Sequence, residues 1–429
     1  MNKFSYFCII LLLILGNYFQ GYAQFSLSGE IRPRTEYTHG LKSLADTKQE
    51  PGFFTSQRTR LNFDFADTTN NIKVGLVLQD VRTWGNQPQL VVADGLFSIH
   101  QAWFNWNISP KISVKAGRQE LVYDDHRIFG NVGWAQQARS HDVAVFKYNQ
   151  KVHLGIAWNQ DNMVLTSNIY TTPKSYKTFQ YLWYHLGDKT NKLNFSLLAL
   201  NNGQPINITD SLGNITKQTI EYSQTLGGRV TYKLTDDLML SSNNYFQIGL
   251  DGSGKDLNAY LTNLDVAYKI GDKFKLMAGF ERQSGNSEID QNAEVNNAFT
   301  PFYGTNHKFN GWMDYFYVGN HVGSVGLQDN YLIGTHQLGE NSRLIWAFHN
   351  FLSANTISND NNGEASNSNS LGNELDLVYI QKVNKVVVFK LGYSQVIATD
   401  NMEFLKGGDK GEVHNWAWMM VVVKPSFIK

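Results

Sequence analysis

Arg58-Thr59-Arg60-Leu61-Asn62-Phe63-Asp64-Phe65 alternates strictly between two kinds of side chain. One face carries the charged and amide groups, and the other carries a threonine, a leucine and two phenylalanines. This period of two is that of a β-strand, whose successive side chains point to opposite faces. A soluble sandwich turns its apolar face to a core, whereas a membrane barrel turns that face to lipid and the polar face to a wet lumen. The solvent that each face meets therefore decides the class of protein.

The same alternation recurs along the chain after residue 24, for example at 225–233, 263–270, 275–281 and 374–379. Near the end of the chain, four apolar side chains share one face: Trp416, Trp418, Met420 and Val422. Tryptophan and tyrosine often fall near the ends of the alternating segments, at Tyr37, Trp84, Trp106, Tyr148, Trp158, Tyr268 and Trp416. Such positions suit rings at a membrane interface, although strands favour aromatic residues in any environment.

The connections between these segments are short and long in turn. Short polar turns fall near 67–71, 109–111, 149–151, 188–191, 235–237, 271–273, 339–341 and 384–385. Longer links fall near 38–53, 83–95, 122–140, 160–178, 201–220, 250–258, 285–321, 353–371 and 399–412. This order predicts an all-β fold, a single transmembrane antiparallel β-barrel of about 18 strands with short periplasmic turns and long extracellular loops.

Composition agrees with one exported domain. The chain has 429 residues with 13% aromatic residues, only 8 prolines and no linker. Lys3, the apolar run 7–15 and the small residues around Ala23 predict a cleaved signal peptide at 1–23, followed by an outer-membrane barrel at 24–429. The apolar run is too short for the ~20 residues of a spanning helix. Cys8 is the only cysteine, so the mature chain is predicted to have no disulfide and no cysteine-ligated metal.

Two segments, 116–142 and 302–320, depart from the strand pattern and resemble the alginate export family of outer-membrane porins. The first matches at Gly117-Arg118-Gln119, Asp125…Arg127, Gly133-Trp134 and Arg139-Ser140…Asp142, and the second at Gly304…His307-Lys308-Phe309 and Gly311-Trp312-Met313-Asp314. The resemblance implies an 18-stranded barrel that is monomeric and passes an acidic polysaccharide. It also implies a lumen lined by arginine and lysine and restricted by loops or a turn.

The candidate pore-lining residues lie on the polar faces of the alternating strands and in the two segments that resemble the alginate export family. A charge on the lipid face costs about 2–4 kcal/mol at the bilayer midplane, so charged strand residues are expected to face the lumen. The predicted set is Arg32, Arg34, Arg58, Arg60, Arg118, Asp125, Arg127, Arg139, Arg229, His307 and Lys308. We expect Arg118, Arg127 and Arg139 to form a constriction, because guanidinium groups suit carboxylates and rings of them select anions.

A structural reading of the same arginines stays open. Each arginine could pair across the lumen with a carboxylate such as Glu30 or Asp64 in a rigid ladder. The formal net charge of zero is compatible with that alternative, and it gives no reason to expect a nucleic-acid partner.

The sequence predicts a channel for an anionic or polar saccharide, surrounded by outer-membrane lipid and needing no cofactor. A general diffusion porin is the nearest alternative, since it would share the fold and differ only in its lumen. A hydrolase is disfavoured because Ser140, His141 and Asp142 are strand neighbours that cannot converge, and no Gly-x-Ser-x-Gly elbow is present. A metal site is disfavoured because the 11 histidines lack ligand spacing. A soluble secreted β-protein does not account for the sorted connections.

Overall fold

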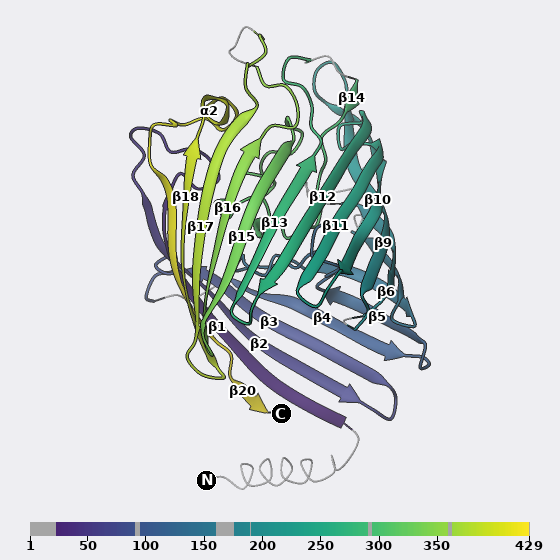
Figure 1. The fold of residues 1–429 in the computed structure, drawn as a ribbon. Helices are drawn as coiled ribbons and strands as arrows, with labels where there is room; N and C mark the ends of the chain where they lie inside the picture. Colours follow the sequence, from purple (N-terminus) through teal and green to yellow (C-terminus); the bar gives the residue numbers. More distant parts are fainter. Residues whose placement is uncertain are drawn as a thin grey trace.

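The computed structural model describes residues 23–90, 95–159, 176–188, 190–290, 294–358 and 363–428. Eighteen antiparallel strands form a closed barrel, because β1 pairs with β2 on one side and with β19 on the other. The start of the first strand and the C-terminus both lie at the end of the barrel that has the short turns. The helix α2 lies at the opposite end, which has the long loops (Figure 1). The predicted signal peptide falls outside the described residues except for Ala23.

The strands of the wall follow one another around the barrel. They are β1 (Ala23–His39), β2 (Gly52–Asp67), β3 (Ile72–Thr83), β4 (Phe97–Asn107), β5 (Ile112–Gln119), β6 (His141–Tyr148), β7 (Val152–Trp158), β8 (Thr178–Leu186), β9 (Leu193–Thr209), β10 (Ile215–Lys233), β11 (Leu238–Leu250), β12 (Asp256–Ile270), β13 (Phe274–Gln283), β15 (Leu327–Gly339), β16 (Ser342–Leu352), β17 (Ser370–Lys382), β18 (Val387–Ala398) and β19 (His414–Val423). The short pieces are β14 (Val295–Asn296), β20 (Ser426–Ile428), η1 (Asn306–Lys308) and α2 (Asp400–Lys406).

The predicted order of short and long connections is confirmed except at two of the long links, and the link expected at 250–258 is only 251–255. The link expected at 201–220 shrinks to 210–214, since β9 and β10 extend past it. Asp210 Oδ1 closes this turn by accepting hydrogen bonds from the backbone N–H groups of Leu212 and Asn214, each at 2.9 Å. The extension was not predicted because residues 201–205 are polar apart from Gly203 and Pro205, so neither face is apolar there.

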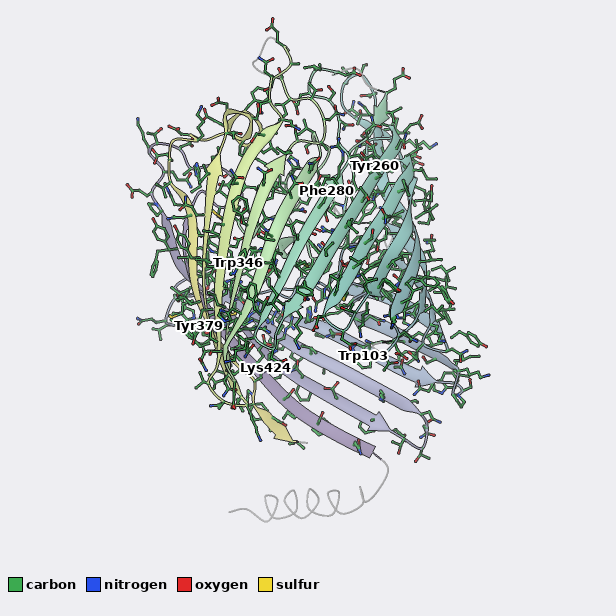
Figure 2. The ribbon with its side chains drawn as sticks, viewed as in Figure 1. Trp103, Tyr260, Phe280, Trp346, Tyr379 and Lys424 are labelled. Atoms are coloured by element: carbon green, nitrogen blue, oxygen red, sulfur yellow. The ribbon has the colours of Figure 1, made fainter. Side chains whose placement is uncertain are left out.

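The outward face of the wall is apolar and the inward face is mostly polar. On β12, Leu264 is 53% exposed whereas its neighbour Asp265 is 8% exposed inside the barrel. The predicted interfacial rings are exposed with one exception, Trp416, which is 2% exposed. Trp416 faces inward because the interior of the barrel holds apolar loop residues against which it packs. In Figure 2, Tyr260 and Phe280 lie toward the long-loop end of the wall, and Tyr379 and Lys424 toward the short-turn end.

Two long connections fold into the barrel and fill much of it. We call them loop L3 (residues 120–140, between β5 and β6) and loop L7 (the described residues 284–290 and 294–326, between β13 and β15). Ile128 and Phe129 of loop L3 pack in a buried cluster with aromatic residues of β8 and β11. Met313 and Tyr315 of loop L7 pack in a second cluster with β16–β19. These two apolar cores explain why the barrel interior is not uniformly polar.

Glycines in the wall make room for inward aromatic rings. A Cβ atom added to Gly279 would lie 2.1 Å from the ring of Tyr331 on the neighbouring strand. The same close approach occurs between Gly392 and Trp418, at 2.1 Å. In each pair the aromatic ring occupies the space that a side chain on the glycine would fill.

Candidate functional site

Arg32 and Arg34 on β1 hold the middle of loop L3 through its backbone carbonyls. Arg32 Nη1 donates to the Gly133 carbonyl at 2.7 Å, and Arg34 Nη1 donates to the Trp134 carbonyl at 3.0 Å. The Arg34 guanidinium carbon also lies 4.2 Å from the centre of the Trp134 ring, in a cation–π contact. Both arginines face inward as the alternation predicted, but their donors are occupied by the loop.

Arg58 and Arg60 on β2 make contacts of the ladder type. Arg58 Nε donates to Glu30 Oε1 at 2.8 Å, which is the cross-strand pairing that the structural alternative anticipated. Arg60 Nε donates to Gln79 Oε1 at 2.7 Å, and its Nη1 lies 3.9 Å from Glu120 Oε1. Within the described residues, the buried Arg60 Nη2 has no hydrogen-bond partner.

Glu120 joins the start of loop L3 to the wall. His100 Nε2 lies 2.8 Å from its Oε1, and Asn131 Nδ2 donates to its Oε2 at 2.8 Å. Burial acts to raise the pKa of Glu120, but the hydrogen bonds from His100 and Asn131 and the nearby charges lower it below its ordinary value. The side chain is therefore an anchoring carboxylate at neutral pH.

Asp125 links loop L3 to the opposite part of the wall and to loop L7. Its carboxylate pairs with Arg229 on β10 and accepts from Asn243 Nδ2 at 2.8 Å. Lys308 of loop L7 donates to the Asp125 carbonyl at 2.8 Å. Burial would raise the pKa of Asp125, yet the Arg229 and Arg127 charges outweigh it and hold the pKa below its ordinary value. Three of the predicted residues thus meet at one point.

Arg127 forms a buried ion pair with Glu281 of β13. The two side chains are only 3% and 1% exposed, so the pair is removed from solvent. The Arg127 guanidinium carbon also lies 3.4 Å from the centre of the Phe309 ring, and Glu281 Oε1 accepts from Asn310 Nδ2 at 2.9 Å. Arg127 therefore connects loop L3, the wall and loop L7.

Arg139 faces a cavity of about 620 Å³ at the long-loop end, bounded by loops L3 and L7 and by β1–β3. Its Nη1 donates to the Gly304 carbonyl at 2.9 Å, and it forms no ion pair with the described residues. Burial lowers the pKa of Arg139. His307 lines the same cavity, where its Nδ1 lies 2.5 Å from Asp314 Oδ1 and its ring stacks on Trp134 at 4.8 Å.

The prediction that Arg118 lines the lumen is wrong. Arg118 and Asp142 pair on the outward face, with Arg118 Nη1 donating to Asp142 Oδ2 at 2.9 Å, and their side chains are 43% and 59% exposed. Arg118 continues the outward series of Val114 and Ala116, so the parity of its own strand already indicated this position. The constriction expected from Arg118, Arg127 and Arg139 therefore lacks its first member.

Sequence reasoning missed a second cavity inside the barrel at the short-turn end. It has a volume of about 340 Å³ and is bounded by the inward faces of β15–β19 and their turns. Five of its 13 lining residues are basic: Arg343, Lys382, Lys385, Lys390 and Lys424. Strand parity identifies two of these residues as inward. Arg343 shares the parity of the inward Ala347 and His349, and Lys390 lies between the outward Phe389 and Leu391.

The residues tested for enzymatic chemistry do not converge. His141 points into the barrel, where its Nδ1 lies 3.2 Å from Tyr176 Oη, while Asp142 points outward. Among the residues that the structure describes, no group of three histidine, cysteine or acidic side chains is placed to hold a metal ion. The described residues also include no helix long and apolar enough to span a bilayer.

The sequence profile described as alginate export matches residues 24–409, nearly the whole described barrel. The chain belongs to the alginate export family. A search of curated protein sequences found no match.

Solved structures of bacterial outer-membrane proteins share the fold of this alginate export family member. OprD of Pseudomonas aeruginosa aligns with a TM-score of 0.61 at 14% identity, over 96% of both chains. OccK9 (OpdG) of the same organism aligns with a TM-score of 0.61 at 10% identity, over 94% of this chain and 99% of its own. OccAB4 of Acinetobacter baumannii aligns with a TM-score of 0.60 at 11% identity, over 95% of this chain and 99% of its own. This protein is an outer-membrane channel of bacteria, with its outward face in lipid.

The two stretches that resemble the alginate export family meet inside the barrel. Phe129 of loop L3 and Tyr303 of loop L7 form a parallel β-bridge, and Gly130 N–H donates to the Tyr303 carbonyl at 2.8 Å. Thr305 N–H donates to the His126 carbonyl at 2.9 Å. The shared family segments thus build one internal partition from loops L3 and L7.

Proposed function

We propose that this channel passes an anionic saccharide by facilitated diffusion, in agreement with the family to which it belongs. The observation that carries the proposal is the sign of the charges on the part of the inner wall next to the short turns. We define the turn-side tier as the inward-facing strand residues within five positions of a short turn. Its basic members are Lys73, Lys115, Lys147, Arg229, Lys233, Lys269, Lys275, Arg343, Lys382 and Lys390. Asp64 is its only acidic member among the described residues.

This segregation explains how a chain of zero net charge supports an anion pathway. The sequence contains 37 basic and 37 acidic residues. Many acidic residues lie in turns outside the lumen, such as Asp188 and Asp210. Others lie deeper in the barrel, where Glu281 and Glu374 bind loop L7. A low-dielectric wall around a basic lumen focuses its field on mobile anions and raises their local concentration. A saccharide with regularly spaced carboxylates is the kind of solute that such a wall favours.

The test is single-channel recording in planar bilayers. Under a KCl gradient we expect a reversal potential that indicates anion preference, and block by tetragalacturonate but not by the neutral maltotetraose. Raising the salt to 1 M should weaken the preference, because the screening length falls to about 3 Å. Arg118→Gln is the matched control, since it removes an arginine from the outward face. A channel without ion preference, blocked equally by both tetrasaccharides, would instead be a general diffusion porin.

A further inference from the structure

The cavity at the short-turn end lies inside the barrel, near Lys424 in Figure 2. Lys382 ends β17, Lys390 follows the start of β18 and Arg343 follows the start of β16, each at an inward position. Lys385 comes from the turn between β17 and β18. Since short turns of outer-membrane barrels lie on the periplasmic side, this is the periplasmic mouth of the channel.

The positive charges of this cavity are almost unbalanced. Arg343, Lys382, Lys385 and Lys390 make no side-chain hydrogen bond and no ion pair with the described part of the chain. Lys424 Nζ lies 3.1 Å from a Glu30 oxygen, but Glu30 already accepts from Arg58. Among the described residues of the lining, Glu340 is the only acidic one. Like charges held together without counter-charges attract anions from solution.

The cavity also has an apolar part. Ile380, Val388 and Val422 share the lining with the basic groups. Ligand cavities typically combine such apolar surface with a few charged groups, and about 340 Å³ lies at the small end of their usual range. A sugar ring presents both kinds of surface, because its C–H face contacts apolar side chains while its carboxylate meets the ammonium groups.

We propose that this cavity is a docking site for the carboxylates of an acidic saccharide chain at the periplasmic entrance. The inference rests on the proposed function and specifies where the saccharide binds first. The saccharide chain is captured in this cavity before it reaches loops L3 and L7. Lysine ammonium groups are hydrated point charges on flexible stems, unlike the planar fork of arginine. Several weak contacts of this kind hold a polyanion by multivalency while each carboxylate remains exchangeable.

The position of the cavity favours a flexible chain over a folded partner protein. Except for Ser342 at the start of β16, its strand residues point into the lumen, so a globular surface cannot reach the basic strand residues past the turns. The opposite mouth differs in charge. The cavity at the long-loop end, which Arg139 and His307 line, includes the carboxylates of Glu36 and Asp314 beside its basic groups. We therefore expect capture of polyanions to be faster from the periplasmic side than from the external side.

The experiment measures block of single channels of known orientation. A cysteine at Leu212, which is 84% exposed at the external end, takes a biotin label, and streptavidin then identifies the external side. Tetragalacturonate is added to one side at a time, with maltotetraose as the neutral comparison and tetraglutamate as the peptide comparison. The variant is Lys382→Gln/Lys385→Gln/Lys390→Gln. The control, Lys111→Gln/Lys151→Gln/Lys192→Gln, removes three charges from short turns at the same rim but outside the cavity.

The expected result is a periplasmic association rate for tetragalacturonate that falls about tenfold or more in the cavity variant, within the range of electrostatic steering. Block from the external side and block of the control variant should not change. Because only folded channels conduct, the recordings themselves exclude misfolding. Unchanged periplasmic association, or an equal loss from both sides, would overturn the docking site while leaving the proposed function intact. Stronger block by tetraglutamate would assign the site to an acidic peptide, and absence of block by any acid in the wild type would overturn both proposals.

Discussion

Arginine and lysine occupy different places inside this barrel. Arg32, Arg34 and Arg58 use their planar forks to bind loop carbonyls and carboxylates at fixed geometry. Lys382 and Lys390 remain without partners in the described chain and face the periplasmic mouth. The difference follows from side-chain chemistry, because a fork with several donors suits a fixed backbone target, whereas an ammonium on a flexible stem suits a moving one. Most of the loop anchors are therefore arginines and most of the candidate substrate contacts are lysines, with Lys308 and Arg343 as the exceptions.

The ion pair of Arg127 and Glu281 is the contact whose loss should be most costly. Arg127→Met leaves the Glu281 carboxylate buried without its cation, and breaking such a pair costs about 3–5 kcal/mol. The measurement is the free energy of unfolding by guanidinium in detergent micelles. The double variant Arg127→Met/Glu281→Met should lose less than the single variant, since it leaves no buried charge. A single variant within about 1 kcal/mol of wild type would contradict the prediction.

The pH dependence of stability should show the contribution of Asp125. Its pKa in the folded state lies below the ordinary value, because the Arg229 and Arg127 charges outweigh burial. A carboxylate of lowered pKa stabilises the folded state above its unfolded pKa of about 4, and this stabilisation is lost as the pH falls through the folded pKa. We expect the free energy of unfolding to decline below about pH 4. In Asp125→Asn the decline should be smaller; an identical decline would exclude this role.

At the level of the elements, glycine positions decide how neighbouring strands pack. Gly279→Ala would place a methyl group against the Tyr331 ring, and such overpacking typically costs about 1–3 kcal/mol. We expect a lower midpoint of guanidinium unfolding for this variant. Gly95→Ala is the matched control, because a Cβ at Gly95 meets nothing within 4 Å. Equal midpoints for both variants would show that the ring moves aside without cost.

The strands and the order of their connections were predictable because both signals are local. Alternation of period two placed Arg58 and Arg229 inward, and the same rule, applied to β5, places Arg118 outward. It could not decide the inward face of β19, since Trp416 and Val421 lie on opposite faces and both are apolar. The contacts between the wall and loops L3 and L7 could not be predicted from the sequence. Arg32 and Gly133 are 101 residues apart, and a backbone carbonyl acceptor leaves no trace in the sequence.

On the scale of the whole molecule, closure of the sheet joins the two ends of the barrel sequence. Thr35 of β1 and Met419 of β19 are direct partners across the seam, with both side chains outward. Paired antiparallel residues bring their Cα atoms to about 4.5–5.5 Å, within the range that a disulfide spans. Thr35→Cys/Met419→Cys should therefore cross-link on oxidation, as seen by altered gel mobility without reductant. Thr35→Cys/Leu375→Cys should not cross-link, because β17 is not a neighbour of β1. A cross-link in this control variant, or no cross-link between β1 and β19, would contradict the closed barrel.

The pairing of β1 with β19 also constrains how the molecule is made. Until the residues from His414 onward are available, the growing sheet has two unpaired edges whose N–H and C=O groups attract other strands. Its apolar outer face is exposed to water during the same period, which favours aggregation of such intermediates. Closure of the barrel therefore requires the chain through β19, and a chaperone that shields both edges until then would prevent aggregation.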